Sequence, residues 1–349
     1  MAEIVLGLGT SHSPMLSLPS ELWSEYAARD QGNPMLLSLE DGSTKTYEEL
    51  LEAADPAIAQ RLTPEVFQSQ YKACQKAINT LEQALAEADP DVVVIVGDDQ
   101  EELFFDDNMP LFSIYWGDSM HLTPRPMGDS PSPATKASMW GYGDVEMDVP
   151  VDSELGLHLI QSLIEDDFDI AQSRYLNEQA GGAVGPIGYL NTQLITKTRP
   201  QAMPHAYAYV VKRIMNDKIR PIVPLTQNTF YPPNQPTPRR CYNLGKAIAK
   251  AVMNWDSGKK VAVVASGGLS HFLVDEEIDQ MAIKGMREKD ADLLASMPRY
   301  RLNSGSSEIL NWVTAAGALE HLDMELVDYV PVYRSPAGTG GGWAFALWR

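Results

Sequence analysis

The sequence predicts an α/β fold, in which helices flank a mostly parallel central sheet within a single domain over residues 1–349. Two runs of small and β-branched apolar residues, Asp91–Val96 and Val261–Ala265, have the composition of strands buried on both faces, as in the middle of a parallel sheet. Stretches with helical periodicity alternate with such runs, and neither an internal repeat nor a linker divides the chain.

Apolar runs that end in glycine or polar residues predict the strands, taken here in chain order. They are Ile4–Gly9, Asp91–Val96, Leu111–Trp116, Ile219–Thr226, Val261–Ala265, Met324–Tyr333 and Trp343–Trp348. Apolar residues at helical spacing predict helices over Tyr47–Ala54, Pro64–Ala88, Val151–Glu165, Pro204–Met215, Tyr242–Trp255, Glu276–Met297 and Gly305–Leu319. Residues from about 20 to 90 are expected to form a peripheral helical insertion, whose apolar stripe indicates core or subunit packing. The proline-rich segment Gly117–Asp152 is expected to be a long irregular loop.

Charge and composition limit the classes of partner. The formal net charge of −20 argues against nucleic acid and anionic membranes as partners, because phosphate groups are bound by basic surfaces. The N-terminus carries neither a basic segment nor a long apolar run, and no window is apolar enough to span a membrane, so a cytoplasmic location is expected. Cys74 and Cys241 are interpreted as two buried thiols in a reducing compartment.

Two histidines follow predicted strands directly. Val261–Ala265 leads through a glycine pair to His271, and Ile4–Gly9 leads to His12. Ligands bind at the carboxyl ends of strands in open α/β sheets, and a histidine placed there can move protons near neutral pH. The alternative is that His271 is a hydrogen-bonded residue that closes a loop. If the two strands are neighbours, both histidines can lie at one site.

Other polar residues are candidates for the same site. The strand Asp91–Val96 ends in Gly97–Glu102 (GDDQEE), whose acidic residues and amide are either solvated or supply oxygen ligands to a divalent metal. His205 opens a predicted helix, a position that favours a neutral imidazole able to donate a hydrogen bond. Glu308 lies in the first turn of another predicted helix, where a capping role is the alternative.

The chain resembles the class III extradiol ring-cleavage dioxygenases, the superfamily of protocatechuate 4,5-dioxygenase, and within it most closely the 3-O-methylgallate and gallate dioxygenase branch. The resemblance covers most of the chain and depends on the order of six motifs. They are Thr10–Pro14 (TSHSP), Gly97–Gln100 (GDDQ), Asn228–Pro233 (NTFYPP), Ser266–His271 (SGGLSH), Ser307–Trp312 (SEILNW) and Tyr333–Gly340 (YRSPAGTG).

The resemblance implies one Fe(II) held by two histidines and one carboxylate. His12 matches the first histidine ligand, Glu308 the carboxylate and His271 the acid–base histidine, while His205 matches a second histidine near substrate and oxygen. The second histidine ligand is replaced, and Gln100 stands at its position. Three outcomes stay open: Gln100 or Asp99 ligates directly, His121 or another residue supplies the missing nitrogen, or iron has been lost.

The activity implied is Fe(II)-dependent extradiol cleavage, by dioxygen, of a catechol-type aromatic acid such as 3-O-methylgallate, gallate or protocatechuate, compounds of lignin breakdown. Phe230 and Tyr231, with Trp140, are expected to sandwich the ring, and Arg334, or else Arg239 or Arg240, to pair with a substrate carboxylate. A homodimer is expected. The alternatives are a metal-dependent hydrolase or lyase on the same fold and a non-catalytic aromatic-binding protein.

Overall fold

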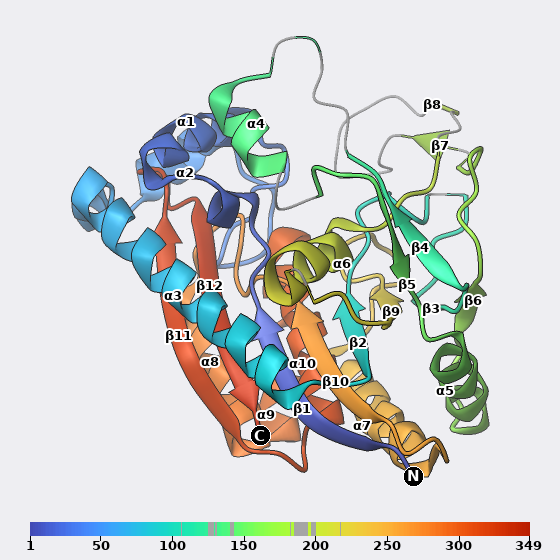
Figure 1. Cartoon of the computed structure of the whole chain (residues 1–349). Coiled ribbons are helices and arrows are strands. Elements are labelled where there is room, and N and C mark those ends of the chain that lie inside the picture. Colours follow the sequence, from blue (N-terminus) through green and yellow to red (C-terminus); the bar gives the residue numbers. More distant parts are fainter. Residues whose placement is uncertain are drawn as a thin grey trace.

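The protein is built around one eight-stranded sheet with helices on both faces (Figure 1), which confirms the predicted fold class. The computed structural model describes residues 1–105, 107–124, 129, 131–139, 143–181, 183–184, 195–196, 200–216 and 218–349. The strand order is β11-β12-β1-β10-β2-β9-β3-β6. β1, β10, β2 and β9 are mutually parallel, and antiparallel pairings flank them, of β12 with β1 and of β3 with β9.

The strands of the large sheet are β1 (Glu3–Thr10), β2 (Val92–Gly97), β3 (Phe112–Tyr115), β6 (Ala171–Ser173), β9 (Ile222–Gln227), β10 (Lys260–Ser266), β11 (Met324–Tyr333) and β12 (Gly340–Trp348). Two small hairpins pair β4 (Ser119–Leu122) with β5 (Met147–Pro150) and β7 (Ala183–Val184) with β8 (Ile195–Thr196). The β4–β5 hairpin lies within the segment for which the sequence predicted only an irregular loop.

The α-helices are α1 (Trp23–Ala27), α2 (Tyr47–Ala53), α3 (Pro64–Ala88), α4 (Pro133–Ser138), α5 (Ser153–Glu165), α6 (His205–Tyr209), α7 (Pro238–Asn254), α8 (Glu276–Glu288), α9 (Ala291–Ala295) and α10 (Ile309–Ala318). A π-helix over Val210–Met215 continues α6. Single 3-10 turns cover Pro14–Ser17, Ser20–Leu22, Ala28–Gly32, Pro56–Arg61, Arg299–Arg301 and Ser304–Glu308. The helix predicted over residues 276–297 is two helices, because Lys289 adopts a left-handed φ of +57° and the Asp290 side chain caps α9.

The central strands are apolar on both sides because both faces of the sheet are covered. In β2, Val92, Val94 and Val96 belong to the core on one face, whereas Val93 and Ile95 belong to the core on the other. The first core packs against α5, α7, α8 and α10, and the second against α3 and α6. Each central strand therefore contributes to two cores, which explains its uninterrupted apolar run.

The prediction of a peripheral insertion over residues 20–90 needs correction. α3 crosses one face of the sheet over β11, β12 and β1 (Figure 1), and its stripe from Phe67 to Leu85 is buried in the core. The short helices before it, as far as Arg61, lie outside that layer. The stripe is core, one of the two packing roles that the sequence indicated.

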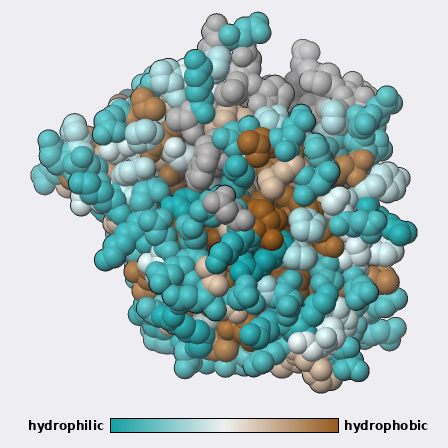
Figure 2. Space-filling model, viewed as in Figure 1, coloured by the Kyte–Doolittle hydropathy of each residue, from teal (hydrophilic) through white to brown (hydrophobic). Residues whose placement is uncertain are grey.

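The helices, the surface and the two cysteines can each be compared with what the composition predicted. None of the described helices is long and apolar enough to cross a membrane. The face of the molecule seen in Figure 2 is covered mainly by hydrophilic residues, with a small hydrophobic group near its centre. Cys74 and Cys241 are buried free thiols, and burial raises the pKa of Cys241 to about 12.

α7 and α10 pack so closely that a glycine is required between them. A Cβ atom on Gly245 of α7 would lie 2.0 Å from the carbonyl oxygen of Thr314 in α10. Gly245→Ala is therefore expected to lower the free energy of unfolding by about 1–3 kcal/mol, because overpacking outweighs the better helix propensity of alanine. Chemical denaturation measures this change.

Gly32 provides the control, because a Cβ atom there would have no neighbour within 4 Å. Gly32→Ala is expected to change the free energy of unfolding by less than about 0.5 kcal/mol. Equal effects of the two substitutions would contradict the close packing of α7 and α10.

Candidate metal centre

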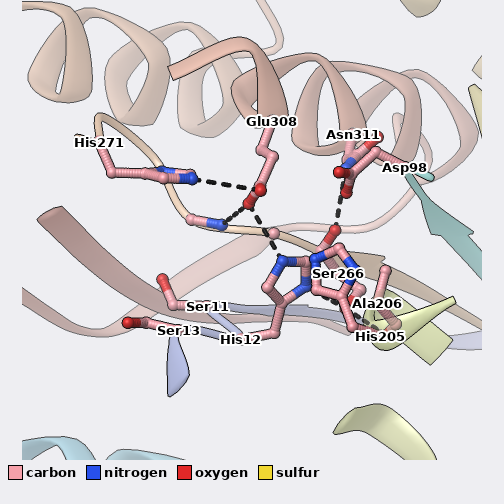
Figure 3. A network of polar contacts seen from close by, with 12 residues as sticks. Ser11, His12, Ser13, Asp98, His205, Ala206, Ser266, His271, Glu308 and Asn311 are labelled. Atoms are coloured by element: carbon pink, nitrogen blue, oxygen red, sulfur yellow. Dashed lines mark hydrogen bonds and ion pairs between the residues drawn. The ribbon is translucent and has the colours of Figure 1, made fainter. Parts of the chain in front are cut away.

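Side chains from separate elements meet at the carboxyl edge of the central strands. His12 follows β1, Asp98 follows β2, His205 opens α6, and Glu308 ends the turn before α10. Their ligand atoms all lie within 4.8 Å of one another, and each of the four residues is at most 4% exposed. Figure 3 shows these side chains close together. The parallel neighbours β1, β10 and β2 end at the same edge of the sheet, so residues far apart in sequence share one site.

Ser266 orients the ring of His12 by a hydrogen bond at Nδ1, the nitrogen that does not face Glu308. The Ser266 hydroxyl donates its single proton to the carbonyl oxygen of Ala206 at 2.6 Å, and it lies 3.0 Å from Nδ1 of His12. Ser266 must therefore accept at that contact, which places a proton on Nδ1 of His12. The other nitrogen, Nε2, carries the lone pair when the ring is neutral, and it lies 3.3 Å from Oε2 of Glu308.

His205 is oriented in the same way by Glu102. The Glu102 carboxylate accepts from Nδ1 of His205 at 2.9 Å and also from the backbone N–H groups of His205 and Gln100, at 3.1 and 3.0 Å. A carboxylate only accepts, so Nδ1 carries the proton and Nε2 is left with a lone pair. A neutral His205 thus donates a hydrogen bond through Nδ1, as expected of a neutral imidazole, and presents an acceptor or ligand atom at Nε2.

Glu102 belongs to the acidic run that the sequence analysis considered, but it was not selected as a site residue, and its contact with His205 can be tested. Glu102→Gln is expected to weaken divalent-metal affinity by about 10- to 100-fold, because an amide can present either oxygen or NH₂ to Nδ1 and no longer fixes the ring. Calorimetric titration with Mn²⁺ measures the affinity. Glu101→Gln, at the adjacent position, is the control. Parent affinity in Glu102→Gln would show that His205 does not depend on this carboxylate.

Glu308 is held at the centre of the cluster. Its Oε2 accepts from the backbone N–H of Gly268 at 2.7 Å, and its Oε1 lies 3.2 Å from Nε2 of His271. Burial alone would raise the pKa of Glu308, but His271 and His12 hold that pKa well below its usual range. The Glu308 side chain makes no capping hydrogen bond to α10, which removes the capping alternative.

His271 lies beside this group and is 20% exposed at its side chain. Its Nδ1 donates to the carbonyl oxygen of Leu269 at 3.0 Å, so the proton on Nδ1 is fixed. Burial lowers the pKa of His271, whereas the charge and hydrogen bond of Glu308 raise it by a larger amount. The net shift of the pKa is therefore upward. The ring is therefore set to hold a second proton at Nε2, the nitrogen that faces the site.

Asp98 is the other residue that the sequence analysis did not select, although it considered the run that contains it. Its Oδ1 accepts from Nδ2 of Asn311 at 3.2 Å. Burial, followed by the charge of Glu308, raises the pKa of Asp98 to about 6, although His205 and His12 act in the opposite direction. The signal in the sequence was position, because Asp98 comes first after Gly97, the last residue of β2.

The donor set fits a divalent cation. Oδ2 of Asp98 is buried without a hydrogen-bond partner in the part of the chain that the structure describes. Two imidazoles and two carboxylates within 4.8 Å can converge on one ion, because ligand atoms on opposite sides of a metal lie roughly 4 Å apart. Mixed nitrogen and oxygen ligands suit iron, manganese and zinc.

A cavity opens beside this cluster. Residues that line it include His12, Gln100, His205, His271 and Glu308, and also Tyr26, Phe272, Arg334 and Trp343. Arg334 is buried and pairs with Asp30 through Nε and Nη2, at 2.6 and 2.7 Å. Gln100 therefore lies at the cavity, beside the group of two histidines and two carboxylates that could hold a metal.

The remaining predicted residues lie elsewhere. The rings of Phe230 and Tyr231 meet edge to face with centroids 5.0 Å apart, and neither residue is among the described residues that line the cavity. His121 is exposed on β4 beside Asp148, at 2.9 Å. Arg239 and Arg240 pair with the exposed carboxylates of Asp292 and Asp169. Trp140 lies outside the described residues.

A family model matches most of this chain, and known proteins match parts of it. The family model described as the catalytic LigB subunit of aromatic ring-opening dioxygenase matches residues 56–340. A 2,3-dihydroxyphenylpropionate/2,3-dihydroxicinnamic acid 1,2-dioxygenase of Cupriavidus necator is 30% identical over 183 residues, which are 52% of this chain and 44% of that protein. The chain thus spans less than half the length of this relative.

Two further relatives are also named as dioxygenases. A protein of the same name from Paraburkholderia xenovorans is 25% identical over 187 residues, 54% of this chain and 45% of that protein. A gallate dioxygenase of Pseudomonas putida is 48% identical over 50 residues, 14% of each chain. Because the family model covers residues 56–340, the chain belongs to the family of catalytic LigB subunits of aromatic ring-opening dioxygenases, as its resemblance to the class III extradiol enzymes implied.

Proposed function

We propose that this protein is an Fe(II)-dependent extradiol dioxygenase that cleaves a catechol-type aromatic acid, such as 3-O-methylgallate, gallate or protocatechuate. The observation that carries the proposal is the buried convergence of His12, His205 and Glu308 beside His271. Two histidines and one carboxylate are the ligand set of many non-haem Fe(II) oxygenases, in which other positions stay open. Fe(II), when bound, would lower the pKa of the catechol hydroxyls and mediate electron transfer from the ring to dioxygen.

The second imidazole ligand in this proposal is His205. The sequence pointed to Gln100 at this position and assigned His205 a place near oxygen. His205 is preferred because Glu102 accepts the hydrogen bond from Nδ1–H, which keeps the proton on Nδ1 and leaves Nε2 with a lone pair on the side of the cluster. An imidazole also binds Fe(II) more tightly than an amide oxygen does. Gln100, on the cavity wall, is then a candidate for contact with the substrate.

His271 is proposed to act as the acid–base residue through Nε2. A cation bound to Glu308 would oppose the negative charge that raises the pKa of His271, so that pKa would fall when the metal binds. Nε2 can then take a proton from the substrate hydroxyl and return one to the ring-opened product. Leu269 keeps the ring in place during both transfers, because its carbonyl binds Nδ1.

Substrate binding is proposed to use the aromatic residues and the arginine that line the cavity beside the metal cluster. Tyr26, Phe272 and Trp343 can flank an aromatic ring. Arg334 is the proposed partner of a substrate carboxylate, because Asp30 holds its Nε and Nη2 and the only partner of Nη1 among the described residues is the sulfur of Met15, at 3.7 Å. Phe230 and Tyr231 remain predicted substrate contacts from the resemblance. A homodimer is also proposed from the resemblance. A cytoplasmic location is proposed from the composition of the chain.

The test is a ring-cleavage assay on protein loaded with Fe(II) under anaerobic conditions. Addition of dioxygen with 3-O-methylgallate, gallate or protocatechuate is expected to consume one dioxygen per ring opened, and both atoms of labelled dioxygen should enter the product. Conversion without dioxygen would indicate a hydrolase or lyase instead. Tight binding of iron and catechol with no conversion would indicate a non-catalytic aromatic-binding protein.

A further inference from the structure

One oxygen of Asp98 has no explained partner. Asp98 is fully buried, and its Oδ1 accepts from Asn311, whereas its Oδ2 has no hydrogen-bond partner among the described residues. A carboxylate oxygen that is buried without a partner destabilises the fold unless a cation or a donor meets it. Asp98 also lies within 4.8 Å, ligand atom to ligand atom, of His12, His205 and Glu308.

The orientation of Asp98 is set by a chain of buried amides. Oδ1 of Asn311 accepts from Nε2 of Gln227 at 2.7 Å, and Oε1 of Gln227 accepts from the hydroxyl of Thr314 at 2.9 Å. These bonds fix which end of each amide is the donor, so Nδ2 of Asn311 must face Asp98 and the carbonyl of Ser266. Asn311 thus holds one carboxylate oxygen and leaves the other to the cluster (Figure 3).

We propose that Asp98 binds the cation through Oδ2, as a fourth ligand of the centre, and that Asn311 is the residue that positions it. The inference depends on the metal centre of the proposed function and extends it. Two carboxylates together neutralise a divalent ion, whereas Glu308 alone would leave a net positive site. An oxygen-richer set also favours harder ions such as Mn²⁺ over softer ones.

Asp99 offers a matched control at the next position. It is also buried, but its Oδ1 accepts from the backbone N–H groups of Glu102 and Leu103, at 3.0 and 2.8 Å, and its Oδ2 accepts from that of Phe104 at 2.8 Å. Asp99 therefore has a structural role in the loop after β2. Asp98→Asn and Asp99→Asn remove the same charge from two buried, adjacent aspartates with different expected consequences.

The experiment compares both variants with the parent protein as metal-free protein and in titrations with Mn²⁺ and Co²⁺. Asp98→Asn is expected to weaken Mn²⁺ affinity by at least about 10-fold and to change the visible absorption of bound Co²⁺. Its metal-free unfolding midpoint should equal or exceed that of the parent, because a buried charge beside Glu308 is removed. Asp99→Asn is expected to lower the metal-free midpoint and to keep parent metal affinity.

Two results would overturn the inference. One is parent Mn²⁺ affinity together with an unchanged Co²⁺ spectrum in Asp98→Asn. The other is a loss of affinity in Gln100→Ala but not in Asp98→Asn, which would assign the position to Gln100. None of these measurements uses substrate or dioxygen, so a protein that binds metal through Asp98 but fails to cleave rings would refute the proposed function and leave this inference intact.

Discussion

Replacement of His271 by glutamine is expected to lower the rate of ring cleavage by about 10²- to 10⁴-fold, the usual contribution of general acid–base catalysis. Glutamine can still hydrogen-bond near the site, but it cannot take up and return a proton at the position of Nε2. His271 is not among the four residues that could hold the metal, so iron content should stay at the parent level. Turnover with saturating substrate and iron analysis of the same preparation measure both effects.

His121 supplies the control for this substitution. It is exposed on β4 beside Asp148, away from the cluster, so His121→Gln should keep parent turnover. Parent turnover in His271→Gln would remove His271 from the acid–base role. Loss of iron from His271→Gln would instead show that His271 belongs to the ligand set.

Replacement of Glu308 by glutamine is expected to have the largest effect on the metal centre. Glu308 lies between His12 and His271, and its loss removes a negative charge from the middle of the cluster. Metal affinity should fall by more than about 100-fold, the upper end of the range for a lost outer partner, because Glu308 is proposed as a ligand itself. Turnover should fall with metal occupancy. Titration of the metal-free variant with Mn²⁺ measures the affinity.

Glu276 is the matched control, because it is a half-exposed glutamate at the start of α8 that pairs with Arg61 at 2.6 Å. Glu276→Gln should bind metal as the parent protein does. Glu308→Gln that retained parent affinity would show that the cluster does not bind the ion through this carboxylate, and the proposed metal centre would then be wrong.

The architecture of the sheet could be predicted because its central strands are buried on both faces. Val92 to Val96 pack alternately into two cores, which requires an apolar residue at every position. The β4–β5 hairpin could not be predicted, since its strands are four residues each and lie in a proline-rich segment without a continuous pattern. The break between α8 and α9 was also missed, because it depends on the backbone of Lys289 and not on apolar spacing.

In the site, residue type and strand-end position pointed to His12 and His271, whereas His205 and Glu308 lie at helix starts and were assigned from the resemblance. Residue type and position were not enough to choose among Asp98, Asp99 and Gln100. Three backbone N–H groups bind Asp99, and Asn311 turns Asp98 toward the cluster. Those partners follow from the path of the loop after β2 and from α10, which is about 200 residues away in sequence, so no local pattern encodes them.

The sequence by itself determined the fold class, the edge of the sheet at which the site lies, and the identity of the histidines and the carboxylate there. It did so because burial on both faces and titratable groups at strand ends leave local patterns. Only the tertiary structure decided which nitrogen of His12 and His205 faces the cluster, that Asp98 joins them, and that Arg334 is held by Asp30. These outcomes depend on hydrogen bonds between distant elements, whose geometry exists only once the chain has folded.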